Sequence, residues 1–267
     1  MSSFWSRIVI ALVLLPLVIG VAYLGGWWLF GLALIGGVIA LHELYTLARA
    51  LRPLLLAGYL GFVLALLGAE LGGAVWMTGG MMLTLLFSFL SFGLSHERPS
   101  ATGSFGVTVL GVAWVGGGLG FLLLLRDIPS HGFWAVIAVM FTVFAADTAA
   151  YFVGRAVGRH RLAPVISPGK TWEGLVAGIV AGVLAAFLIL YKDRETFLSI
   201  PETLALGAAV VLASVCGDLF ESAVKRDLSV KDSGRLLGGH GGMLDRLDAL
   251  LWAGPAAFYV VLAFGAS

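Results

Sequence analysis

Apolar residues form nine stretches along the chain, and charged residues, glycine or proline separate them. A bilayer core about 30 Å thick requires roughly 20 apolar residues per transmembrane helix. This pattern predicts an all-α polytopic membrane protein with about nine transmembrane helices. Only residues 69–71 separate the third stretch from the fourth, so this pair is the least distinct. The stretches comprise residues 8–24, 27–47, 54–68, 72–94, 105–125, 132–154, 174–190, 203–220 and 249–264.

The distribution of Lys and Arg tests this number of helices, because cytoplasmic loops of membrane proteins are enriched in these residues. With nine helices and a cytoplasmic amino terminus, thirteen of the sixteen Lys and Arg residues lie on the cytoplasmic side. Arg126, Lys192 and Arg194 lie on the other side. Joining the third and fourth stretches lowers the cytoplasmic share to ten, so the charge bias favours nine helices. We expect a multi-pass protein of the inner (cytoplasmic) membrane whose polar site faces the cytoplasm.

The composition agrees with a membrane protein. Of the 267 residues, 60% are hydrophobic and only 12% are charged, which excludes an ordinary soluble domain. The net charge of +1 provides no basic excess for binding nucleic acid. The single cysteine, Cys216, lies in an apolar stretch, and we expect it to be a small buried residue. The first stretch follows Arg7 as in a signal peptide, but no small-x-small cleavage site follows it, so we expect a retained helix.

Charged residues are concentrated in the second half of the chain. Residues 147–248 carry 22 of the 31 acidic and basic side chains. Two polar loops stand out there, residues 155–173 and 221–248, and one short outside hairpin separates them. Both loops therefore lie on the cytoplasmic side and can form one site at the membrane edge. We divide the chain into N-terminal transmembrane helices, residues 1–146, and a C-terminal catalytic region, residues 147–267.

Five carboxylates lie within or beside the apolar stretches of the C-terminal region. A carboxylate at such a depth is costly unless it is paired, hydrated or bound to a cation, so each is a functional candidate. Asp218 and Glu221 are three residues apart and project from one helix face, as do Asp245 and Asp248. Two acidic faces beside a basic loop suit a hydrated divalent cation together with a polyphosphate, whereas a structural ion pair is the alternative. The fifth carboxylate is Asp147.

The loop that follows Glu221 combines cations with glycines. Ammonium and guanidinium groups suit phosphate oxygens, and glycines let backbone N–H groups approach an anion. The loop therefore predicts a phosphate-containing substrate. The cations are Lys225, Arg226, Lys231 and Arg235, and the glycines Gly238, Gly239, Gly241 and Gly242 surround His240.

The other loop contains the segment SPGKTWEG, residues 167–174. Ser167 and Lys170 are candidate phosphate or substrate contacts, and Glu173 opens the next helix, where its charge suits the helix dipole. The segment is not a nucleotide P-loop, because Pro164 stands where that pattern requires glycine and no strand is predicted before it.

Two further patterns indicate structure rather than chemistry. His42 and Glu43 begin a zinc-protease pattern, but Thr46 replaces the second histidine, so we interpret the pair as a polar patch at a helix end. Glycine recurs at every fourth position in the stretch of residues 174–190, which predicts a helix-packing face. These glycines are Gly174, Gly178 and Gly182.

A longer motif spans residues 222–248. It matches every fixed position of the form S-x-hydrophobic-K-R-x4-K-D-x-small-x2-hydrophobic-x2-H-G-G-hydrophobic-x-D-R-hydrophobic-D. This form resembles the carboxy-terminal signature of the phosphatidate cytidylyltransferases, also called CDP-diacylglycerol synthases. The segments DTAAYFVGR, SPGKTWEG and GDLFES also resemble this family, so the detailed similarity extends from Asp147 to the end. Departures from the family pattern fall at Gly169, Gly238 and Ala249, and none of them affects a charged motif position.

The resemblance implies transfer of a cytidylyl group from CTP to phosphatidic acid, which yields CDP-diacylglycerol and pyrophosphate in phospholipid biosynthesis. It implies Mg²⁺ as cofactor, and whether a second cation is divalent or K⁺ stays open. The lipid phosphate is already ionised at neutral pH, so metal-assisted in-line attack on the CTP α-phosphate needs alignment and charge neutralisation rather than a strong general base. The implied partners are CTP, phosphatidic acid and the bilayer, and a homodimer is compatible with the glycine-rich helices.

The resemblance also implies roles for individual residues. Asp218 and Asp245 are expected to be the main metal ligands, and Asp147, Glu221 and Asp248 to be secondary ligands or to orient basic residues. His240 either contacts the nucleotide or orders the glycine-rich turn. Lys225, Arg226 and Lys231 are expected to hold the triphosphate or pyrophosphate, and the other substrate-binding candidates are Ser167, Lys170, Ser222, Arg235, Gly241, Gly242 and Arg246.

Three alternatives to this function remain at the level of sequence. A transporter would also bury carboxylates, but it predicts acids in both halves of the chain, whereas the first half is nearly free of charge within its apolar stretches. A CTP-dependent polyprenol kinase is disfavoured by the complete signature. A cytidylyltransferase acting on another membrane lipid phosphate is the closest alternative.

Overall fold

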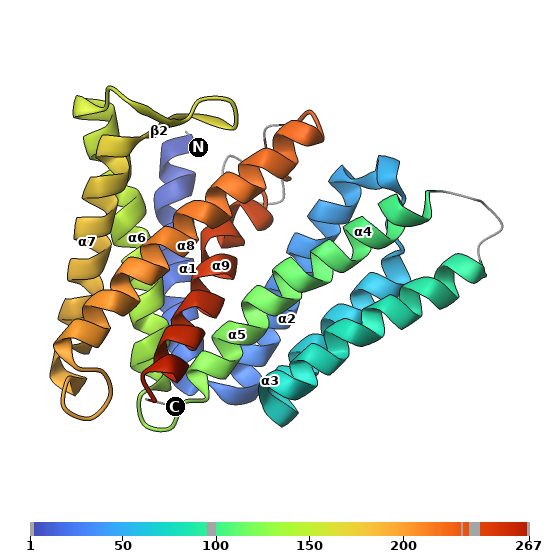
Figure 1. The fold of residues 1–267 in the computed structure, drawn as a ribbon, viewed down its shortest axis with the longest axis horizontal. Helices are drawn as coiled ribbons and strands as arrows, with labels where there is room; N and C mark the ends of the chain where they lie inside the picture. Colours follow the sequence, from blue (N-terminus) through green and yellow to red (C-terminus); the bar gives the residue numbers. More distant parts are fainter. Residues whose placement is uncertain (1–2, 95–99, 231, 235–240, 266–267) are drawn as a thin grey trace. The chain divides into compact units, whose positions relative to one another are not determined.

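The computed structural model describes residues 3–94, 100–230, 232–234 and 241–265, with side chains of the first helix from residue 14 onward. Within these residues, seven helices are long and apolar enough to cross a membrane. The prediction of an all-α polytopic membrane protein is therefore confirmed. The helices labelled in Figure 1 are α1 (Ser3–Leu24), α2 (Gly26–Leu47), α3 (Leu55–Gly93), α4 (Ala101–Gly111), α5 (Gly117–Arg126), α6 (Gly132–Val157), α7 (Trp172–Leu190), α8 (Ile200–Asp227) and α9 (Leu244–Ala263).

Three short helical segments complete this part of the chain. A π-helical segment (Val112–Gly116) joins α4 to α5, so that the two form one apolar helix from Ala101 to Arg126. Two 3₁₀ helices (Arg49–Leu51 and Tyr191–Asp193) follow α2 and α7.

Helix α3 reverses direction at Gly73, where the backbone leaves the helical conformation (φ 73°, ψ −163°). A positive φ costs glycine little because it has no Cβ atom. The two arms of the hairpin then pack closely, because a Cβ atom on Gly80 would lie 2.5 Å from the backbone nitrogen of Ala65. Both arms are visible in Figure 1. The reversal lies immediately after residues 69–71, where the sequence predicts the boundary between the third and fourth apolar stretches.

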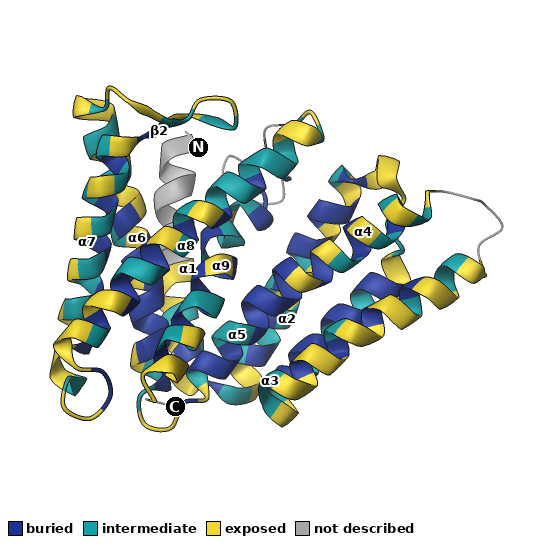
Figure 2. Ribbon diagram, in the orientation of Figure 1, coloured by how far each residue is buried: buried dark blue, intermediate teal, exposed yellow. Residues whose placement is uncertain are grey.

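The packing of α7 on α6 depends on the predicted glycine face. Cβ atoms added to these glycines would lie 2.8–3.1 Å from carbonyl oxygens of α6, so larger residues would push the helices apart. The opposite face of α7 carries exposed aliphatic side chains four residues apart, such as Val180 and Leu184. Exposed positions recur along α7 in Figure 2. Such a face suits lipid rather than water. The close pairs are Gly174 with Ala150, Gly178 with Ala146 and Gly182 with Thr142.

The prediction that Cys216 is buried is wrong. Its side chain is exposed on α8, whereas Ser214, Gly217 and Glu221 are buried on the same helix. An apolar stretch does not reveal which side of a membrane helix faces protein and which faces lipid, because both sides are apolar.

The chain forms two compact units, each built from two separate segments. The first unit comprises Met1–Leu124 and Asp232–Leu247, and the second comprises Leu125–Lys231 and Asp248–Ser267. Segments distant in sequence therefore meet within each unit. The polar residues of the two units are described separately below.

A small β-hairpin is the one departure from all-α structure in the described part of the chain. Strands β1 (Arg161–Ala163) and β2 (Ser167–Thr171) pair antiparallel within the loop predicted at residues 155–173. The prediction that no strand precedes the SPGKTWEG segment is therefore wrong, because pairing with β2 extends residues that have no apolar strand pattern of their own. Thr171 then caps α7, because its Oγ1 accepts a hydrogen bond from the Gly174 backbone N–H at 3.1 Å. Glu173 lies in the first turn, as predicted, and its carboxylate is 2.7 Å from His160 Nδ1. The hairpin thus leads Lys170 directly to the start of α7.

Candidate active site

Asp218 is the centre of a charged cluster in the second unit. Lys170 Nζ, on β2, lies 2.7 Å from Asp218 Oδ2, and Ser222 Oγ donates a hydrogen bond to Asp218 Oδ1 at 3.4 Å. Asp147, on α6, interacts electrostatically with both Asp218 and Lys170. The Asp218 side chain is 36% exposed, so it is not sealed inside the protein. Three segments of the chain therefore bring four predicted site residues together.

A second ion pair lies one helical turn farther along α8. Lys225 Nζ donates to Glu221 Oε2 at 2.6 Å, and the Glu221 side chain is only 2% exposed. Asp248, on α9, interacts electrostatically with Asp218, Glu221 and Lys225. Among the described residues, the acidic groups of this unit therefore share a small number of cations.

Helix α8 extends farther than the sequence predicts. It continues to Asp227, so Ser222, Lys225 and Arg226 lie on its last two turns rather than in a loop. Basic residues are favourable at this end of a helix because the unsatisfied carbonyl groups carry partial negative charge. The helix holds these cations at fixed spacing from Asp218 and Glu221.

The donor chemistry of this cluster fits Mg²⁺, which prefers oxygen ligands. Asp147, Asp218, Glu221 and Asp248 supply four carboxylates within one unit. In the part of the chain that the structure describes, however, no group of three or more His, Cys, Asp or Glu side chains is close enough to hold a metal ion. Asp218 and Glu221 instead contact lysines. The assignment of metal ligands therefore stays a prediction.

Asp245 belongs to the first unit and has a different environment. Its carboxylate accepts hydrogen bonds from the backbone N–H groups of Ser233, at 3.1 and 3.2 Å, and Gly242, at 2.8 Å. The Asp245 backbone N–H lies 3.4 Å from Ser233 Oγ, so the two residues bond reciprocally. Asp245 thus joins the chain on either side of residues 235–240. Its predicted partner Asp218 lies in the other unit, so their joint role as metal ligands stays a prediction.

Glu43 is the polar residue whose importance the sequence interpretation misses. It lies on α2, is 8% exposed, and accepts hydrogen bonds from Ser233 Oγ at 3.1 Å and from the backbone N–H groups of Met243 at 3.0 Å and Leu244 at 2.9 Å. The interpretation as a polar patch at a helix end is therefore too weak. The rule that an intramembrane carboxylate is a functional candidate, applied above to Asp147, identifies Glu43 as well.

The other predicted residues have simpler positions. Ser167 lies at the start of β2, and Arg246 lies in the first turn of α9. Gly241 has a positive φ of 77°, which glycine adopts without strain. Lys231, Arg235 and His240 lie outside the described residues, so their predicted contacts with phosphate stay predictions.

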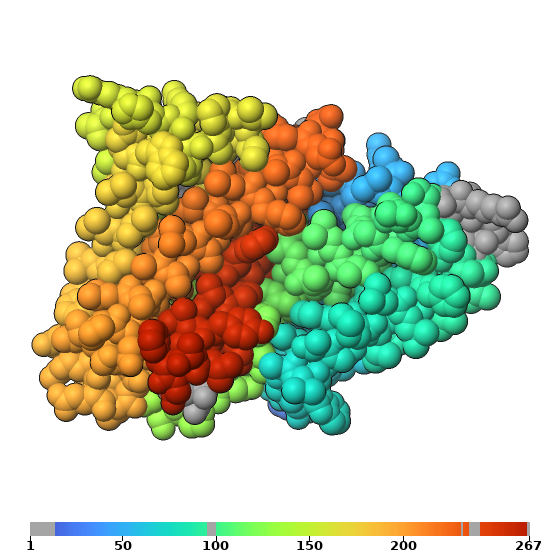
Figure 3. Space-filling model, viewed as in Figure 1, coloured from blue at the N-terminus to red at the C-terminus, as the bar shows by residue number. Residues whose placement is uncertain are grey.

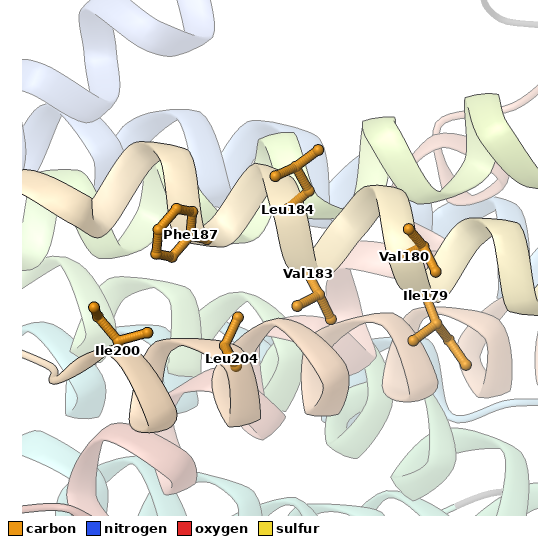
Figure 4. Close-up of a pocket in the computed structure, with 7 residues that line it drawn as sticks. All are labelled: Ile179, Val180, Val183, Leu184, Phe187, Ile200 and Leu204. Carbon is orange, nitrogen blue, oxygen red and sulfur yellow. The ribbon is translucent and has the colours of Figure 1, made fainter.

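A groove of about 410 Å³ runs between α7 and α8, whose side chains pack along each other in Figure 3. The close-up in Figure 4 shows that its walls carry aliphatic and aromatic side chains. A polyphosphate needs cations or N–H donors, so this groove is not where phosphate chemistry takes place. It is lined by Ile179, Val180, Val183, Leu184, Phe187, Ile200 and Leu204.

Comparison with known proteins identifies similar chains in bacteria. The chain is 38% identical over 277 residues to a phosphatidate cytidylyltransferase of Pseudomonas aeruginosa, covering 97% of each chain. It is 36% identical over 251 residues to a phosphatidate cytidylyltransferase of Mycobacterium bovis, covering 84% of this chain and 79% of the relative. A third enzyme of that name, from Brucella suis, is 33% identical over 271 residues, covering all of this chain and 94% of the relative.

The similarity also holds at the level of the family. A model of the cytidylyltransferase family matches residues 5–264, which is nearly the whole chain. The match includes the N-terminal helices, for which the sequence motifs alone provide only a similarity in hydropathy. The resemblance inferred from the motifs is therefore confirmed, and the chain belongs to the cytidylyltransferase family.

Proposed function

We propose that this chain transfers a cytidylyl group from CTP to phosphatidic acid, forming CDP-diacylglycerol and pyrophosphate. The names of its relatives and the complete motif at residues 222–248 support this reaction. The observation that carries the proposal is the cluster around Asp218, where Lys170 of β2 meets carboxylates from α6 and α8. Such a mixture is suited to binding phosphates together with a cation.

The chemistry requires little of a general base. A phosphate oxygen of the lipid forms a new bond to the α-phosphorus of CTP, and the bond from that phosphorus to the oxygen bridging to the β-phosphate breaks. Pyrophosphate leaves with the electron pair. Because both reactants are anions, lowering their repulsion and aligning them in line account for the catalysis. We assign this neutralisation to Lys170, Lys225 and Arg226 in the second unit.

The carboxylates have the complementary role. When Mg²⁺ is bound, it supplies charge neutralisation at the phosphate oxygens. We assign its ligands to Asp218 and Asp245, with Glu221 and Asp147 as further candidates. In the structure, Lys170 pairs with Asp218. Its ammonium group has three N–H donors, so it can move from the Asp218 carboxylate to a phosphate oxygen of a bound substrate.

We also infer nine membrane passes with both polar loops on the cytoplasmic side of the inner membrane. Counting the two arms of α3 separately and adding α1 to the candidate helices supports this number. The bias of Lys and Arg supports the orientation. In this topology CTP arrives from the cytoplasm, while phosphatidic acid enters from the adjacent leaflet.

The test is pyrophosphate release by the purified protein in detergent, supplied with CTP, Mg²⁺ and phosphatidic acid. We expect release that requires all three components and is lost when ATP replaces CTP. A second arm supplies other lipid phosphates in place of phosphatidic acid. No release with phosphatidic acid by a folded, CTP-binding protein would contradict the proposal, and release with another lipid phosphate would identify that lipid as the acceptor.

A further inference from the structure

Glu43 connects two parts of the chain that are about 200 residues apart in sequence. Its contacts with Ser233 and Leu244 span 190 and 201 residues, respectively. All of these residues belong to the first compact unit. The carboxylate therefore lies at a junction between α2, the Ser233 segment and the first turn of α9.

The bonding of Glu43 differs from that of an ordinary ion pair. Both carboxylate oxygens accept hydrogen bonds, Oε1 from Met243 N and Oε2 from Leu244 N and Ser233 Oγ. Within the described residues, Glu43 forms no ion pair with Lys or Arg. Its charge is balanced by backbone and hydroxyl donors at the N-terminus of α9, where the helix dipole favours an anion. Among the residues that the structure describes, this carboxylate therefore holds backbone and hydroxyl groups rather than a cation.

Helix α2 provides a fixed base for this carboxylate. Leu41, Leu44 and Tyr45 surround Glu43 in sequence and are at most 2% exposed. The Tyr45 hydroxyl donates to the Thr108 carbonyl oxygen of α4 at 2.8 Å. The end of α2 is thus anchored by packing and by a buried hydrogen bond, so Glu43 has little freedom to move away from the segment that it holds.

The residues held by Glu43 are the same residues that hold Asp245. The Ser233 hydroxyl donates to Glu43, and the Ser233 backbone N–H donates to Asp245. Ser233 Oγ also accepts a hydrogen bond from the Asp245 backbone N–H. Gly242 donates to Asp245, and the next two residues donate to Glu43. A shift of Glu43 would therefore be transmitted to the Asp245 carboxylate through both segments.

We propose that Glu43 is a positioning residue for cytidylyl transfer, which fixes the Ser233 segment and the start of α9 so that Asp245 is held in its working orientation. This inference rests on the proposed function, because it assigns Asp245 to the reaction. Glu43 itself does not contact the substrates. A substitution of Glu43 should therefore change the kinetics as a displaced Asp245 would, and not as the loss of a phosphate contact would.

The principal test is E43Q compared with E70Q in the purified enzyme. Glutamine keeps the size of the side chain, but one of its terminal atoms is an N–H donor and faces donors in this site. We expect E43Q to lower kcat/KM by about 10- to 100-fold, the cost of losing a hydrogen bond to a charged group. We expect the effect mainly in kcat and in the Mg²⁺ concentration for half-maximal activity, with KM for CTP nearly unchanged. Glu70, a partly exposed acid on α3, is the matched control and should retain wild-type values.

Two additional variants separate positioning from folding. S233A removes one hydroxyl while leaving the backbone bonds of Glu43 in place, so it provides the same readouts if E43Q does not fold. The double variant E43Q/S233A should lose no more activity than E43Q alone, because both changes break one linked network. A folded E43Q, or S233A in its place, with wild-type kcat and Mg²⁺ dependence but a lower melting temperature would overturn the proposal in favour of a purely structural role.

Hydrogen exchange provides a readout independent of activity. Amides that bond to Glu43 should exchange faster in E43Q than in the wild type, at Met243 and Leu244 and not in α6 or α7. If the wild-type protein releases no pyrophosphate, the proposed function fails, while faster local exchange still supports the hold of Glu43 on this segment. Unchanged exchange at the Met243 and Leu244 amides would overturn the positioning role of Glu43.

Discussion

The two compact units use carboxylates in different ways. In the second unit, Asp218 and Glu221 pair with the flexible side chains of Lys170 and Lys225. In the first unit, Glu43 and Asp245 accept hydrogen bonds from backbone N–H groups and from Ser233. A lysine can exchange a carboxylate for a phosphate at small structural cost, whereas a backbone amide can move only if the fold changes. The comparison indicates that the acids of the second unit pair with cations that can exchange partners, whereas the backbone holds the acids of the first unit in fixed orientations.

The largest expected effect is that of D218N on activity. Removing this charge should lower pyrophosphate release by at least about 10³-fold, since it deprives the site of a proposed metal ligand and of the partner of Lys170. Because Asp218 is partly exposed, the free energy of unfolding in detergent should change by less than about 1 kcal/mol. Near-wild-type activity over a Mg²⁺ titration would contradict the assignment of Asp218 to chemistry.

The Glu221–Lys225 pair tests whether breaking a buried ion pair lowers the stability of the second unit. K225M should lower the free energy of unfolding by about 3–5 kcal/mol, because it removes the lysine partner of a buried carboxylate. The double variant E221Q/K225M should recover most of this stability while its activity stays low. Thermal and denaturant unfolding measure the first expectation, and a double variant as unstable as K225M would contradict the explanation.

The first unit should lose stability when a methyl group is added beside Glu43, even though no charge changes. G242A would place a methyl group against Ser233 Oγ and Glu43 Oε2, so we expect a loss of about 1–3 kcal/mol in unfolding free energy. G79A is the matched control, because no atom lies within 4 Å of its added Cβ on α3. This control should be neutral or stabilising by up to about 1 kcal/mol. Equal destabilisation by both variants would show that crowding at Glu43 is not the cause.

The smallest expected effect concerns the entry to α7 beside Lys170. T171A removes the hydroxyl that caps the helix, which should cost about 1 kcal/mol of stability. T171S retains the hydroxyl and should keep most of the stability. If T171S loses as much as T171A in thermal unfolding, the methyl group that packs near Gly158 matters more than the cap.

Much of the site can be predicted because its acids stand out in apolar stretches. Asp147, Asp218 and Glu221 are recognisable from their unfavourable surroundings, and the structure brings them close to predicted cations. The end of α8 is less predictable, because Lys225 and Arg226 suit both a loop and the last turn of a helix. Cys216 could not be placed from the pattern, since protein-facing and lipid-facing sides of a membrane helix are both apolar.

The sequence by itself determined the membrane class, the apolar stretches, the family resemblance and the concentration of charged residues after Asp147. These features are local, because hydropathy and motif spacing are read over a few neighbouring residues. Only the tertiary structure decided that Glu43 holds the start of α9 and that Lys170 meets Asp218. The physical reason is that every residue except proline carries the same backbone N–H donor. A carboxylate bonded to amides 200 positions away therefore leaves no complementary residue in the sequence to reveal its partner.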